Sequence, residues 1–173
     1  LQMTTLGGLE ASPHFAKGLL DRAQAISENP SEETVILLAH GTGSDEANAH
    51  WMDNLLSMAD TMRAHGGDAF RDIKVHTWRE DWPEKRKQTI PEIQKMVTEA
   101  ADTGTALVVP ARTTAQGRAS QYLEGLDYRY GKGFAPHPQF EAWMREQIET
   151  GIDRLQNAPQ SPDPATTTAQ AGE

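Results

Sequence analysis

His40 has the clearest chemical potential in this chain because of its place in the sequence. It follows a continuous apolar run at residues 34–39 and opens the loop His-Gly-Thr-Gly at residues 40–43. A run of this length predicts a strand buried on both faces of a parallel sheet. An imidazole at the end of such a strand can ligate a metal or transfer a proton near neutral pH. A histidine that only hydrogen-bonds its own loop is the alternative interpretation.

Two more polar segments follow apolar runs. Residues 79–81 (Arg-Glu-Asp) come after the run at 72–78, and residues 111–118 come after the run at 105–110. Parallel strands direct their carboxyl ends to one edge of the sheet, and ligands bind beyond that edge. We therefore expect both loops to lie beside His40.

Glu80 and His76 are candidates to complete a metal site with His40, because carboxylate oxygen and imidazole nitrogen both ligate divalent metals. A solvated, charged turn would explain Glu80 equally well. Alternation along a strand puts His76 and Trp78 on one face, so His76 also fits a surface position.

The third loop carries Arg112 and Arg118, which are positive charges in a chain of formal net charge -9. Arginines can hold carboxylates through two parallel hydrogen bonds. We expect Arg112, Arg118 and the neighbouring Thr113 to bind an anionic substrate. Surface solubility is the alternative role for the two arginines.

Composition excludes several classes of function. The acidic charge leaves no basic surface for a phosphate backbone, so we expect no nucleic-acid partner. No apolar run approaches the roughly 20 residues of a membrane span. The chain has no cysteine, so a metal would have to use His, Asp or Glu. A G-x-G-x-x-G motif fails at Glu46 and no Walker sequence occurs, so no organic cofactor is expected. No G-x-S-x-G elbow occurs, so an esterase would lack its nucleophile.

Strand-like runs alternate with helical patterns, which predicts an α/β domain with a parallel sheet and right-handed crossovers. We expect an N-terminal helix and linker at residues 1–33, the α/β domain at 34–157, and a disordered polar tail at 158–173. Because the chain begins at Leu1, we expect a processed or excised piece of a longer product. The expected location is cytoplasmic, with export after signal removal as the alternative.

Helices are expected at the following places: residues 13–26, from Ser44 to the glycines at 66–67 with Trp51 in the apolar stripe, 83–101 with a kink or division at Pro91, 120–123, and 138–155 with Phe140, Trp143, Ile148 and Ile152 available for packing. A fourth strand is expected at residues 127–130.

The order of these motifs resembles the class II tetrapyrrole metal chelatases of the sirohydrochlorin cobaltochelatase type. The resemblance rests on residues 35–43 with 46–48, on 108–110 with 117–118, and on Pro-His-Pro at 136–138 before the closing helix. It implies a flavodoxin-like domain of four parallel strands, used as a homodimer or paired with a second chelatase-like domain.

The resemblance also implies a metal-binding histidine, which falls on His40. That residue would hold Co²⁺, Ni²⁺ or Fe²⁺ as a substrate and accept protons from the pyrrole nitrogens. An octa-carboxylate tetrapyrrole would suit Arg112 and Arg118. Many family members have a second histidine where this chain has Ala119, and a glutamate for which Glu80 is a near equivalent.

The leading hypothesis is therefore a chelatase-like enzyme that inserts a divalent metal, with His40 as ligand and base and Glu80 as the supporting carboxylate. The alternatives are a non-catalytic domain that binds metal or tetrapyrrole, and one half of a two-domain chelatase.

Overall fold

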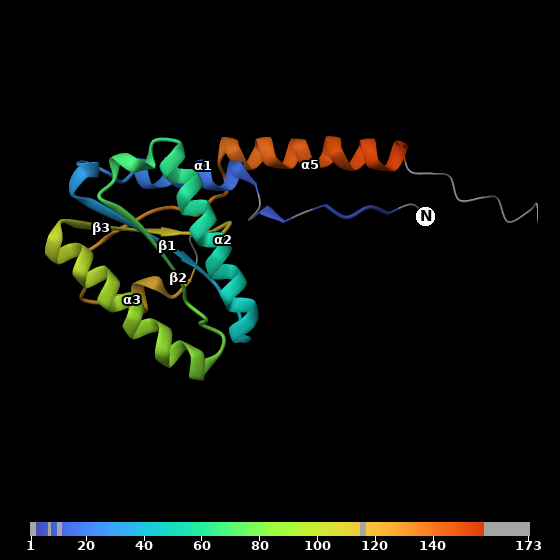
Figure 1. Ribbon diagram of the computed structural model, residues 1–173. Coiled ribbons are helices and arrows are strands. Elements are labelled where there is room, and N and C mark those ends of the chain that lie inside the picture. Colours follow the sequence, from blue (N-terminus) through green and yellow to red (C-terminus); the bar gives the residue numbers. More distant parts are fainter. Residues whose placement is uncertain (1–2, 7, 10–11, 115–116, 158–173) are drawn as a thin grey trace, which may run out of the picture.

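The computed structural model describes residues 3–6, 8–9, 12–114 and 117–157, and its centre is a parallel sheet of four strands in the order β2-β1-β3-β4. This is the flavodoxin-like order expected from the sequence, with helices on both faces (Figure 1). The strands are β1 (Glu33–Ala39), β2 (Asp72–Thr77), β3 (Thr105–Pro110) and β4 (Arg129–Tyr130). The helices are α1 (Pro13–Gln24), α2 (Asp45–Ala64), α3 (Pro83–Thr103), α4 (Ala119–Tyr122) and α5 (Pro138–Gln156), with 3₁₀ turns η2 (Pro30–Glu32) and η3 (Gly67–Ala69).

Strand β1 lies between β2 and β3, and every one of its residues is buried. Because side chains alternate along a strand, Val35 and Leu37 pack in the core formed with α1 and α2, whereas Ile36 and Leu38 pack in the core formed with α3. The continuous apolar run therefore supplies both cores. The two sides of the sheet are called the α1/α2 face and the α3 face below.

Helix α1 packs on the sheet. Ser12 caps its first turn by accepting a hydrogen bond from the His14 N–H. Phe15 and Leu19, from the expected N-terminal helix, are buried in the same core as the strands of the α1/α2 face.

Helix α3 continues through Pro91 from Pro83 to Thr103, so the expected division is not seen. Thr89, Ile93 and Val97 form one buried row on both sides of the proline, and this packing offsets the missing N–H. In α2, the buried residues are Leu55, Met58, Ala59 and Met62, whereas Trp51, which was expected in the apolar stripe, is 40% exposed.

Helix α5 lies beside α1 and extends beyond the sheet (Figure 1). Phe140 packs against the core as expected. Ile148 and Ile152 were also expected to pack but are exposed, and α5 has no buried residue. Strand β4 is shorter than expected, and the tail at residues 158–173 lies outside the described residues. Among the described residues, no helix combines the length and apolarity that a membrane crossing requires.

Candidate functional site

The loop after β1 has a backbone that only glycine fits well. Gly41 has φ +76°, and a Cβ on it would lie 2.7 Å from both Asn48 Oδ1 and Thr77 Cβ. The Asn48 side chain accepts hydrogen bonds from the Thr42 N–H at 3.3 Å and the Thr77 hydroxyl at 3.0 Å. A Cβ on Gly43 would collide with the Trp82 ring. The loop is therefore packed closely against α2, β2 and the loop after β2.

Arg79 joins the loop after β1 to the loop after β2. Its backbone has φ +49°, which is uncommon for a residue with a side chain. The backbone N–H of Arg79 donates to the His40 carbonyl at 2.8 Å, and the buried guanidinium donates to the carbonyls of Thr42 at 2.7 Å and Gly43 at 2.9 Å. An ion pair with Asp45 at 2.8 Å completes its contacts. Arg79 therefore holds the two loops together and does not itself face a ligand.

His40 lies at the carboxyl edge of the sheet, as expected, with its side chain 29% exposed. Its Nδ1 lies 3.0 Å from the Gly41 carbonyl, and its Nε2 lies 2.9 Å from Asp81 Oδ2 and 3.9 Å from Glu80 Oε1. The ring packs edge-on against Trp82. Both ring nitrogens face acceptor oxygens, so Nε2 needs a proton or a cation between itself and the carboxylates.

Glu80 links His40 to the third loop, since its side chain is only 11% exposed and Arg112 Nη1 donates to Oε1 at 2.9 Å. The loops after β2 and β3 therefore meet, as the topology predicts. Tyr130, at the end of β4, lies close enough to Arg112 and Glu80 to be affected by their charges. His40, Glu80, Asp81, Trp82, Arg112 and Tyr130 are called the His40 cluster below. Burial raises the pKa of the Tyr130 hydroxyl, with Arg112 opposing the shift and Tyr128 and Glu80 adding to it.

Arg118 and Thr113 lie on different sides of this cluster. A cavity of about 370 Å³ is lined by Glu80, Asp81, Arg86, Gly117 and Arg118, so Arg118 faces the two carboxylates across an open space. Thr113 instead lines an apolar hollow together with Arg112. Ala119 is buried on the α3 face beside Leu123 and does not line this cavity.

The structure does not bring His76 together with His40. Its Nε2 pairs with Glu92 of α3 at 3.1 Å, and its Nδ1 accepts from the Thr77 N–H at 2.9 Å. His76 points to the α3 face because strand alternation puts it on the side of Trp78, as noted from the sequence. Within the described ranges, no group of three His, Asp or Glu side chains is arranged to hold a metal.

Three residues of the cluster were not predicted as site residues. Asp81, next to Glu80 in a loop already selected, makes the shortest contact to His40 Nε2. Trp82 packs on His40, which no local pattern indicates. Tyr130 could have been found by extending the strand-end rule to the fourth strand, because it ends β4 at the same edge of the sheet.

Comparisons with known proteins support the fold. No protein-family model and no curated protein matches the chain. Among solved structures, the chain is similar to DR2241 from Deinococcus radiodurans, a multi-domain protein described as structurally similar to chelatases with two additional novel domains. The TM-score is 0.53 at 21% identity over 79% of this chain, which covers only 29% of that protein. The chain therefore has a chelatase-like α/β fold.

Proposed function

We propose that this chain is a chelatase-like domain that binds a divalent metal ion at His40 and delivers it to a carboxylated tetrapyrrole. The observation that carries this proposal is the position of His40 Nε2, between Asp81 Oδ2 and Glu80 Oε1 at the carboxyl edge of a chelatase-like sheet. Ligand sites of open α/β sheets lie at this edge.

The donor set suits a metal that is held and then released. One imidazole nitrogen and carboxylate oxygens match Co²⁺, Ni²⁺ and Fe²⁺, which accept both ligand types. Since the described residues do not assemble three ligands in advance, coordination positions remain for the macrocycle nitrogens. A metal retained by few protein ligands can be transferred, whereas a closed four-ligand site would keep it.

Metal insertion displaces two protons from the pyrrole nitrogens, and this site has acceptors for both. Once the metal leaves, His40 Nε2 is free to take one proton, and the adjacent Asp81 carboxylate can take the other, since they lie 2.9 Å apart. Arg118, across the 370 Å³ cavity, would bind a peripheral carboxylate of the macrocycle and hold it over these acceptors.

Calorimetric titration with Co²⁺ tests the metal site. In His40→Ala we expect the affinity to fall about tenfold or more, because the one nitrogen ligand is lost. His76→Ala is the matched control, since His76 pairs with Glu92 on the α3 face, and its affinity should stay within about twofold. Equal affinity in the wild type and His40→Ala would refute the metal site.

Insertion itself is tested by the absorption change of a sirohydrochlorin-type macrocycle when Co²⁺ is added with the chain. We expect the spectral change to accelerate in the presence of the chain and to return to the uncatalysed rate in His40→Ala. Macrocycle metallation at the same rate with both proteins would exclude His40 as the delivering residue.

A second candidate is a binding domain that holds the metal or macrocycle and depends on another domain or a second copy for insertion. Ala119, buried where relatives of the resembled family have a second histidine, favours it. Binding of Co²⁺ without any acceleration of insertion would support this candidate, and insertion by the isolated chain would reject it.

A further inference from the structure

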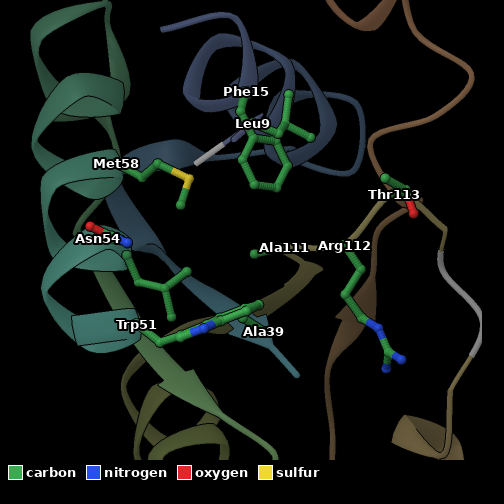
Figure 2. Close-up of a pocket in the computed structure, with 10 residues that line it drawn as sticks. Leu9, Phe15, Ala39, Trp51, Asn54, Met58, Ala111, Arg112 and Thr113 are labelled. Carbon is green, nitrogen blue, oxygen red and sulfur yellow. The ribbon is translucent and has the colours of Figure 1, made fainter. Parts of the chain in front are cut away.

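An apolar hollow of about 240 Å³ opens beside the His40 cluster, on the α1/α2 face of the sheet. Its floor is formed by Ala39, the last residue of β1, and by Ala111, which follows β3, and its walls come from α1 and α2 (Figure 2). The lining residues are Leu9, Phe15, Ala39, Trp51, Asn54, Leu55, Met58, Ala111, Arg112 and Thr113.

The hollow lies at the topological switch point of the sheet. Strand order β2-β1-β3-β4 reverses direction between β1 and β3. Ala39 is the last residue of β1, and Ala111 directly follows β3. Crevices at such points bind ligands in open α/β sheets. The hollow exists because the side chains at these two positions are small, and a larger residue would fill it. It therefore lies where the fold favours ligand binding.

The lining specifies a ligand class. Most of the wall is aliphatic or aromatic, with Trp51 at one side (Figure 2). Among the described lining residues, Arg112 carries the one charge, and Thr113 and Asn54 supply a hydroxyl and an amide. The volume is below the roughly 300–1,000 Å³ of pockets that hold whole drug-sized ligands. It fits one flat ring system or a short apolar arm that ends in a carboxylate, because an arginine binds that group through two hydrogen bonds.

Arg112 is shared between the hollow and the metal site. Its guanidinium extends away from Leu9 and Phe15, and Nη1 holds Glu80 Oε1 at 2.9 Å (Figure 2). In this arrangement Glu80 Oε1 stays 3.9 Å from His40 Nε2. A carboxylate that draws Arg112 toward the hollow removes the main competitor for Glu80, which then can join Asp81 in facing a cation at Nε2.

We propose that the hollow binds an apolar ring or arm bearing a carboxylate, and that this ligand strengthens metal binding at His40 by taking Arg112 from Glu80. The inference rests on the proposed metal site. The coupling is reciprocal by thermodynamic linkage, so the metal also tightens binding of the acid.

The test measures Co²⁺ affinity by calorimetry with and without saturating indole-3-propionate, an aromatic carboxylate small enough for the hollow. We expect the acid to tighten Co²⁺ binding about five- to tenfold, within the usual range of such couplings. Indole-3-propionamide, which has the same shape but no charge, should leave the Co²⁺ affinity unchanged. An unchanged affinity with the acid, or equal effects of acid and amide, would overturn the inference.

Variants assign the effect to the named residues. In Arg112→Gln, Glu80 is already released, so Co²⁺ should bind more tightly without the acid and the acid should add nothing. Arg145→Gln, on the exposed face of α5, should keep the full effect. Ala111→Leu fills the hollow, and the exposed Trp51→Ala removes one wall without filling the interior, so either should weaken binding of the acid. A full coupling in Arg112→Gln would refute the role of Arg112.

The same titrations separate this inference from the proposed function. Failure of Co²⁺ to bind at His40 under any condition refutes both, whereas Co²⁺ binding that ignores the acid refutes only the coupling. A zinc-loaded octa-carboxylate porphyrin, which cannot take up Co²⁺, identifies the source of the ligand. Displacement of indole-3-propionate by this porphyrin would assign the hollow to an arm of the macrocycle, and its retention would assign it to a free small acid.

Discussion

Two glutamates at opposite edges of the sheet, Glu33 and Glu80, have contrasting surroundings. Glu33 begins β1 and is 1% exposed, and its carboxylate accepts from the Glu28 and Asn29 N–H groups, the Ser27 hydroxyl and Arg129. Glu80, at the carboxyl edge, has one close partner, Arg112, and faces His40 at 3.9 Å.

The number of hydrogen bonds that each carboxylate accepts distinguishes Glu33, which stabilises the fold, from Glu80, which can react or bind a ligand. Burial alone would raise the pKa of the Glu33 carboxyl, but the hydrogen bonds from Glu28, Ser27 and Asn29 and the charge of Arg129 together lower it. A buried carboxylate that already accepts four hydrogen bonds has little to offer a ligand. Glu80 keeps unused acceptor capacity beside a histidine, and this makes it available for chemistry.

The largest loss of folding stability is expected from Glu33→Gln. The amide would place N–H donors against the donors that the carboxylate accepts from, and would leave Arg129 without its buried partner. We expect a loss of about 3 kcal/mol in the free energy of unfolding, measured by urea denaturation. Glu80→Gln, with one partner lost at a partly open site, should cost about 1 kcal/mol or less. Equal losses in the two variants would remove the distinction.

The Glu33 contribution should also depend on pH. Because the folded-state pKa is lowered, the stabilisation is present above the ordinary value of 4.5 and is lost as the pH falls through the lower folded-state value. The difference in unfolding free energy between the wild type and Glu33→Gln should therefore shrink between about pH 7 and about pH 3. A difference that stays constant over this range would show that charge is not what stabilises the amino edge.

At the carboxyl edge, stability should depend on backbone conformation and close packing rather than on a buried charge. Gly41→Ala meets both a positive φ and close contacts with Asn48 and Thr77, so we expect a loss of about 2 kcal/mol or more. Gly66→Ala has φ +104° with nothing within 4 Å, and should cost about 1 kcal/mol from the backbone alone. Thermal or urea unfolding measures both. If Gly66→Ala were the more harmful change, the packing around Gly41 would not be what fixes the His40 loop.

The smallest effect on stability is expected from His40→Ala. The side chain is partly exposed and its contact to Asp81 lies at the surface, so the unfolding free energy should change by about 0.5 kcal/mol or less. The same variant is expected to lose Co²⁺ binding, so its stability and its binding should separate. A loss of stability as large as that of Glu33→Gln would make His40 a structural residue.

The sequence predicted the sheet because periodicity reports burial directly. The apolar run before His40 predicted a strand covered on both faces, and the strand-end rule brought the loops of Glu80, Arg112 and Arg118 to the same edge. The rule predicts where the loops lie, however, and does not predict how the side chains within them are oriented. His76 failed as a partner of His40 since it points to the α3 face, while Asp81 was passed over within the chosen loop.

Other parts of the structure depend on contacts that are distant in sequence. Trp82 reaches His40 because Gly43 has no side chain, a contact between two loops that no local pattern encodes. The helical spacing in α5 indicated an apolar face, but spacing does not say whether a partner covers that face, and Ile148 and Ile152 are exposed. Pro91 did not divide α3, as the buried row across it outweighs a local preference.

Substitutions at the two alanines on the floor of the hollow would change which ligands the domain can bind. Exchanging Ala39 at the end of β1, or Ala111 just after β3, for a larger or smaller residue would change the size of the hollow through a single substitution. The His40 loop, fixed by Gly41 and Arg79, would keep its shape during such changes. The size of the ligand that the hollow accepts can therefore change among descendants of this sequence while the backbone of the His40 loop stays the same.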